Sequence, residues 1–277
     1  MKFTNHVASL LLAAAIPFAP AFAADYDPPV VIDDAPEMVP VEVGSGWYLR
    51  GDLGYVISSK MDNPVYRIID PASGTYSLSG FQGEMDNPLT FGAGFGYHFN
   101  DLLRADLTVD GMRSGFDGRG ASGSPCSGGL PGTGCRTESD SEMSAVSFMA
   151  NGYVDLGTIA GLTPYVGAGA GYTYVSWDSL DTNSYCTGAC GGVGLVGQTQ
   201  NGGTTDWRFT WQAMAGVAYA INSNLKLDLG YRYRQISEGD MFKWNAAEQA
   251  LGATGNKGID GDLSQHEIRI GLRYDLW

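Results

Sequence analysis

The chain has 277 residues and a formal net charge of -14, with 40 glycines, 15 tyrosines, 11 phenylalanines and 6 tryptophans. The negative charge argues against nucleic-acid binding, which requires a basic surface. Beyond the first 25 residues no apolar run approaches the roughly 18 to 20 residues of a membrane-spanning helix, which argues against a helical membrane protein. Abundant glycine and aromatic residues are instead typical of a β protein with tight turns and aromatic belts.

Residues 1–23 are predicted to be a secretory signal peptide. Lys2 gives a positive start, Leu10 to Phe18 form an apolar core, and Ala21-Phe22-Ala23 supplies a cleavage site of small residues. We expect the mature chain to begin at Ala24 or Asp25. Secretion favours disulfides over metal sites or catalytic thiols for the four cysteines, because the compartment is oxidising.

Residues 24–45 are predicted to be an acidic, proline-containing periplasmic leader. The stretch 25–43 holds four prolines and no basic residue. Such a composition cannot bury enough apolar surface to fold alone, so an extended chain is expected. A solvated linker is favoured over a partner-binding segment.

From Gly46 onward, apolar and polar residues alternate in eight segments of roughly the length that a tilted membrane strand requires. We predict strands at 46–56, 88–99, 102–112, 143–155, 163–177, 206–219, 224–236 and 265–276. The connections between them alternate between long ones (57–87, 113–142, 178–205 and 237–264) and short ones (100–101, 156–162 and 220–223).

Tight turns at one end and long loops at the other are typical of an outer-membrane barrel, whereas a soluble sandwich has short and more even connections. We therefore predict that residues 46–277 form an all-β, eight-stranded antiparallel up-and-down transmembrane β-barrel. Both chain ends should lie on the periplasmic side. The four long connections are expected to be irregular external loops with little core of their own.

One parity of each predicted strand carries no charged residue, as in Leu225, Leu227 and Leu229. This side should face lipid, because Arg or Lys near the bilayer midplane costs roughly 2 to 4 kcal/mol. Aromatic residues near the strand ends are predicted to form a girdle at the headgroup level. They are Trp47, Tyr97, Trp207, Tyr219 and Tyr233.

The opposite parity carries a nearly balanced set of charges, which predicts an interior filled by ion pairs. The predicted network is Arg50, Asp52, Arg104, Asp106, Asp110, Asp155, Arg208, Lys226, Asp228, Arg232, Arg234, Glu267, Arg269, Arg273 and Asp275. Glycines on the same face, such as Gly92 and Gly271, are expected to leave room for the Arg and Lys side chains. An eight-stranded barrel is only just wide enough for side chains, so a closed lumen is favoured over a narrow ion path.

The four cysteines lie in two of the long connections. Cys126 and Cys135 belong to the second, and Cys186 and Cys190 to the third. We predict one local disulfide in each, which would restrict a segment with little core. A Cys-x-x-x-Cys spacing without a nearby histidine is a weak metal signal, so no metal site is expected.

Catalysis requires a nucleophile beside a base. Only His98 and His266 remain after signal removal, the first facing inward and the second near the external rim. Neither has a serine at the His-x-Ser spacing of barrel deacylases. An Asp/His site of the omptin kind stays open as an alternative, although no pair stands out, and we expect no enzyme and no cofactor.

The start Gly46-Trp47-Tyr48-Leu49-Arg50-Gly51-Asp52-Leu53-Gly54-Tyr55 and the end His266-Glu267-Ile268-Arg269-Ile270-Gly271-Leu272-Arg273-Tyr274-Asp275-Leu276-Trp277 resemble a known family. It is the family of small outer-membrane β-barrel surface proteins of alphaproteobacteria, of the porin-family and opacity type. The resemblance covers about residues 46–277. It implies insertion by the outer-membrane assembly machinery, with Tyr274, Leu276 and Trp277 as the assembly signal. Trp277 fits this signal only partly. Counting back from it two residues at a time gives Asp275 and Arg273, whereas the apolar row runs through Tyr274 and Leu276.

The resemblance implies a structural outer-membrane barrel that contributes to envelope integrity and displays its four external loops. Two alternatives stay open: a narrow porin for ions or small solutes, and an adhesin or receptor acting through the loops. Outer-membrane lipids and lipopolysaccharide, the assembly machinery and an extracellular ligand of the loops are the expected partners.

Overall fold

The computed structural model describes residues 46–70, 74–77, 81–123, 125–126, 131–191 and 194–276. The predicted signal peptide, the leader and Trp277 lie outside these residues. The strands of the barrel are β1 (Trp47–Met61), β5 (Leu89–His98), β6 (Leu103–Ser122), β7 (Gly134–Asp155), β8 (Leu162–Trp177), β11 (Thr205–Ala220), β12 (Leu225–Ile236) and β15 (Leu263–Asp275). Each overlaps one strand predicted from the sequence.

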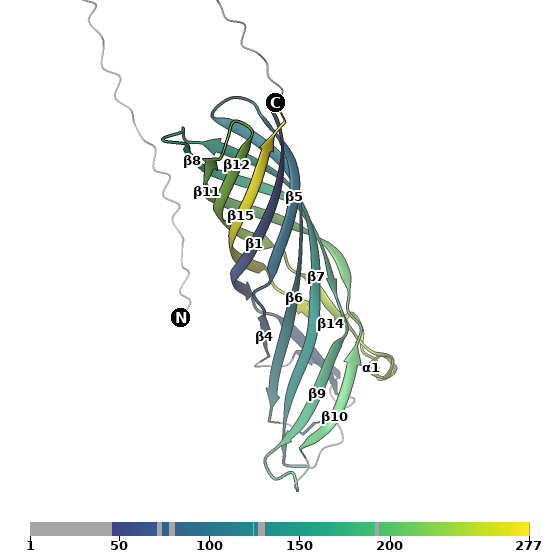
Figure 1. Ribbon diagram of the computed structural model, residues 1–277. Helices are drawn as coiled ribbons and strands as arrows, with labels where there is room; N and C mark the ends of the chain where they lie inside the picture. The colour runs from purple at the N-terminus through teal and green to yellow at the C-terminus, as the bar shows by residue number, and fades with distance from the viewer. Residues whose placement is uncertain are drawn as a thin grey trace, which may run out of the picture. The chain divides into compact units, whose positions relative to one another are not determined.

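These strands pair in the ring order β1-β5-β6-β7-β8-β11-β12-β15, and every pairing is antiparallel. The ring closes because β1 pairs with β15 as well as with β5, so that Leu53 lies opposite both Ile270 and Phe91. The prediction of an eight-stranded up-and-down barrel is therefore confirmed. Figure 1 shows these strands together, with β6 and β7 extending well beyond the other strands at one end.

Successive side chains of each barrel strand point alternately outward and into the lumen, so that apolar and charged side chains lie on opposite faces. Outward side chains such as Leu229, Leu53 and Ile270 are exposed, whereas their inward neighbours are buried. No helix among the described residues combines the length and the apolar character needed to cross a membrane. Where the eight strands form the ring, their uncharged outer rows suit contact with lipid.

The expectation of irregular external loops is wrong. The long connections contain β2 (Val65–Asp70), β3 (Gly74–Ser77), β4 (Gln82–Met85), β9 (Leu180–Thr187), β10 (Leu195–Asn201), β13 (Gly239–Lys243), the helix α1 (Ala246–Ala250) and β14 (Asn256–Asp260). We call these elements, with residues 113–122 of β6 and 134–142 of β7, the external module. Its strands are short and pair with distant segments, which a local sequence pattern does not reveal.

The external module contains two sheets. One has the strand order β4-β6-β7-β9-β10 in its external part, and the other has the order β13-β14-β2-β3. Their apolar side chains join one buried cluster that also includes residues at the external mouth of the barrel. Phe116 of β6, Trp177 of β8 and Phe242 of β13 meet there with ring centroids 5.4 to 6.0 Å apart. The barrel is therefore capped by a hydrophobic core.

Both predicted disulfides are present. Cys126 bonds to Cys135 and Cys186 to Cys190. Cys135 lies directly opposite Cys186 in the pairing of β7 with β9. The two cross-links therefore stabilise neighbouring strands of the module, and not free loops.

Candidate functional site

The end of the barrel where β1 begins and β15 ends is the one predicted to face the periplasm, and it is called the periplasmic end. A cluster around Arg50 occupies this half of the lumen. Its guanidinium group binds Asp106 at 2.7 Å and Asp52 at 2.8 Å. Arg104 pairs with Asp155 at 3.1 Å and lies over the Tyr153 ring, 3.9 Å from its centroid. Each buried charge here has an opposite charge in contact, which offsets its loss of hydration.

A second cluster fills the next layers towards the external side. Arg232 is fully buried and binds Glu267 at 2.6 Å and Asp110 at 3.1 Å. Arg269 joins the two clusters, because it contacts Asp110 at 3.1 Å and Asp52 at 3.2 Å. The two clusters therefore form one network of ion pairs.

The remaining predicted charges lie at the edges of this network. Lys226 and His98 both contact Asp275 at the periplasmic rim, at 2.9 and 3.3 Å. Arg273 binds Asp228 at 3.2 Å. Arg234 is weakly paired, since its nearest carboxylate, Glu267, is 3.7 Å away.

The lumen glycines accommodate more than basic side chains. A Cβ atom on Gly92 would lie 2.6 Å from Oδ1 of Asp110, and one on Gly216 would lie 2.6 Å from the Tyr165 hydroxyl. These close approaches show that carboxylates and tyrosines also use the space. The expectation that it serves Arg and Lys was thus incomplete.

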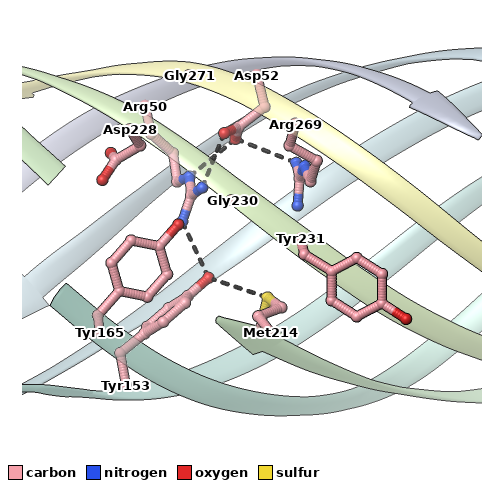
Figure 2. Close-up of a pocket in the computed structure, with 10 residues that line it drawn as sticks. All are labelled: Arg50, Asp52, Tyr153, Tyr165, Met214, Asp228, Gly230, Tyr231, Arg269 and Gly271. Carbon is pink, nitrogen blue, oxygen red and sulfur yellow. Dashed lines mark hydrogen bonds and ion pairs between the residues drawn. The ribbon is translucent and has the colours of Figure 1, made fainter. Parts of the chain in front are cut away.

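One internal cavity borders Arg50, Tyr153, Tyr165, Met214 and Arg269 (Figure 2). Its volume of about 10 Å³ for the centre of a water molecule is just enough for one water. Figure 2 shows Asp52 between Arg50 and Arg269, and the Tyr153 hydroxyl between Arg50 and the sulfur of Met214. The cavity offers no passage for a solute.

Arg208, predicted to belong to the lumen network, lies instead at the external mouth. It binds Asp260 of β14 at 2.5 Å and Asp206 of its own strand at 3.0 Å, and donates to the Asp240 carbonyl of β13 at 2.8 Å. The amide of Gly239 also donates to Asp260. Burial raises the pKa of Asp260 to about 6, against the opposing effect of Arg208. Arg208 thus ties the barrel to the second sheet of the module.

A second buried ion pair anchors the module's helix. Lys257 binds Glu248 at 2.5 Å and the Asn201 side chain at 2.8 Å, and it lies near the Trp244 ring. Glu248 also closes a capping box with Asn245 at the start of α1. Lys257 and Asn201 are far apart in the sequence, and no local pattern indicates that they meet, so only the tertiary fold reveals this contact.

The predicted girdle residues divide between the two ends of the barrel. Trp47 and Tyr97 pack together near the periplasmic end, with ring centroids 5.2 Å apart, and Tyr219 is exposed at the same end. Trp207 packs on Tyr174 towards the external end. Tyr233 packs there on Trp211. Of the predicted assembly signal, Tyr274 is exposed on the outer face, Leu276 is half-buried and Trp277 is not described.

The two histidines lie far apart. His98 contacts Asp275 and the Tyr48 ring, and His266 shares a short hydrogen bond with the Tyr231 hydroxyl. Within the described ranges no hydrogen bond joins either histidine to a serine or cysteine, and no group of three His, Cys, Asp or Glu side chains is arranged for a metal ion.

The geometry defines a transmembrane barrel with an ion-paired interior and a folded external module. The chain belongs to the outer-membrane protein β-barrel domain family, whose model matches residues 8–275. It is a protein of the outer membrane. The family is one of barrel proteins, and membership alone does not identify an activity.

Relatives of similar length extend the comparison. The chain is 36% identical over 262 residues to an uncharacterized protein of Brucella abortus, and the aligned region covers 87% of this chain and 88% of that protein. It is 26% identical over 239 residues to a Rickettsia conorii protein named "Putative adhesin", with 84% of each covered. Among solved structures, OprG of Pseudomonas aeruginosa is 17% identical with a TM-score of 0.47, covering 83% of this chain and 95% of that one.

Proposed function

We propose that this protein is a closed, non-catalytic barrel that contributes to envelope integrity and displays the external module as a folded surface. One observation carries this proposal: buried ion pairs and an apolar core occupy the lumen in successive layers. Ion pairs such as Arg50 with Asp106 and Arg232 with Glu267 occupy the membrane-spanning part, and the core around Phe242 covers the external mouth.

Planar-bilayer recording of the refolded full-length protein tests the proposal. A filled barrel should give no stable conductance steps under conditions in which a general porin conducts. The gel mobility of the unheated protein must show that the barrel has folded. Regular single-channel steps from folded protein would instead establish the narrow-porin alternative.

Adhesion is a second candidate function. The folded module supports it, because binding surfaces depend on segments that a rigid scaffold holds in place. The name given to the Rickettsia conorii relative also favours it. Replacing β9 and β10 by a short turn should abolish adherence of bacteria displaying the protein, while leaving the barrel assembled in the outer membrane.

A further inference from the structure

One exposed face of the external module carries an unbroken row of carboxylates. Glu84 lies opposite Asp117, Asp117 opposite Asp140, and Asp140 opposite Asp181. Residues directly opposite in antiparallel strands project from the same face, and like charges in such positions destabilise a sheet. Partial burial and the neighbouring carboxylates raise the pKa of Asp140, which lies in the external part of β7.

Nearby cations among the described residues do not pair with this row. No ion pair to Glu84, Asp117, Asp140 or Asp181 occurs within the described part of the chain. The next row carries Arg119 opposite Glu138, and Arg136, one row further on, binds Glu138 at 3.3 Å. The described residues also present no group suited to a metal ion. Basic side chains from outside the molecule would therefore be the natural counter-charge.

The row ends at an open sheet edge. Asp181 lies opposite Gln200 of β10, whose side-chain amide donates to it at 2.9 Å. β10 pairs with β9 on one side, and residues 195–200 have no described strand on the other. Exposed edges are usually protected by charged residues or proline, but residues 195–201 contain neither. A bulge near Leu195 leaves the stretch 197–201 regularly paired to β9.

We propose that β10 is a docking edge for an extended, basic segment of an extracellular protein. The segment adds as a further strand through its backbone, and its Lys or Arg side chains reach over Gln200 towards Asp181. That span is two strand spacings, roughly 10 Å, which a long basic side chain covers in large part. A second copy of the chain is disfavoured as occupant, because it brings a like-charged face and a net charge of -14.

This proposal rests on the adhesin function proposed above. The experiment that tests it uses full-length protein folded in detergent micelles. The probe is a fluorescent seven-residue peptide of alternating Thr and Lys, with a Thr and Glu peptide as its control. In about 150 mM salt, where charges are screened beyond about 8 Å, the Lys peptide should bind and the Glu peptide should not. Binding should slow hydrogen exchange of the amides in residues 197–201.

Two charge variants locate the site. D140N/D181N removes the carboxylates nearest β10 and should weaken binding about tenfold, or about 1.4 kcal/mol. E84Q/D86N removes the same charge at the opposite edge of the sheet, several strand spacings away, and should change the affinity less than about twofold. Unheated gel mobility confirms that each variant has folded.

Proline variants test the backbone contact. Successive amides of a strand point to opposite edges, so one of Gln198→Pro and Thr199→Pro removes a donor that faces away from β9. That variant should abolish binding of the Lys peptide, while the hydrogen-exchange protection of the β9 amides stays unchanged.

Equal weakening by both charge variants, unaltered binding by both proline variants, or no Lys-peptide binding up to about 1 mM would overturn the proposal. So would a dimer in sedimentation that excludes the peptide. Conductance would refute the closed barrel and leave these readouts unaffected.

Discussion

At the scale of single residues, the contribution of each ion pair in the lumen depends on how deeply both of its charged groups are buried. Arg232 has no exposed surface, and its two carboxylate partners, Glu267 and Asp110, are buried as deeply. Removing one member of such a set leaves a buried charge without hydration and with fewer partners. Lys226, by contrast, is partly exposed at the periplasmic rim, where water can replace its contact with Asp275.

Arg232→Met should therefore lower the free energy of unfolding by about 3 to 5 kcal/mol, because it removes the closest cation of Glu267 and one of the two cations that contact Asp110, while both carboxylates stay buried. Lys226→Met should lower it by less than about 1 kcal/mol. Urea unfolding in lipid vesicles, followed by gel mobility, measures both. Equal losses for the two variants would show that burial does not set the contribution of these ion pairs.

Sequence parity identified which residues face inward but not which of them pair. Arg50 and Asp52 are close in sequence, so their contact is foreseeable, whereas Arg232 meets Asp110 only because the ring closes. Arg208 shows the same limit. Its parity is inward as expected, but its partner Asp260 comes from an element that the sequence did not reveal.

At the scale of elements, the barrel strands were predictable because lipid imposes an uncharged row on each of them. β9, β10, β13 and β14 lack that constraint, since they lie beyond the bilayer. Their burial depends on each other's side chains, as with Phe242 of β13 against Trp177 of β8. Polar stretches such as residues 197–201 of β10 therefore look like loop in the sequence while forming strand in the fold.

Asp260 makes the attachment of β13 and β14 dependent on pH. Its folded-state pKa of about 6 lies above the ordinary aspartate value, so the folded module binds the proton more tightly than the unfolded segment does. The resulting stabilisation is complete below about pH 4 and is lost as the pH rises through 6, by up to about 3 kcal/mol.

Hydrogen exchange of the β13 and β14 amides, corrected for intrinsic rates, should show more frequent opening at pH 7.5 than at pH 5. Asp260→Asn should remove most of this difference, because the variant side chain does not titrate. Asp262→Asn, two residues along the chain, is the matched control and should retain it. Identical opening at both pH values in the unsubstituted protein would contradict the assignment.

At the scale of the whole molecule, two separate barriers lie in series across the lumen. The ion-pair layers occupy the membrane-spanning part, and the apolar cluster around Phe116 and Phe242 lies at the external mouth. We expect either barrier alone to exclude hydrated ions, since the cavity beside Arg50 has room for about one water and the second barrier is apolar. Closure should therefore survive removal of the external barrier.

Replacing residues 237–262 by a two-residue turn tests this directly. The variant joins β12 to β15 as a hairpin and removes β13, α1 and β14, but leaves Arg232 with Glu267 and Arg50 with Asp106 in place. It should assemble, shift on an unheated gel, and stay silent in planar bilayers. Stable conductance would mean that the hydrophobic cap, and not the paired charges, seals the lumen. The charges would then line a pore that the external module keeps shut.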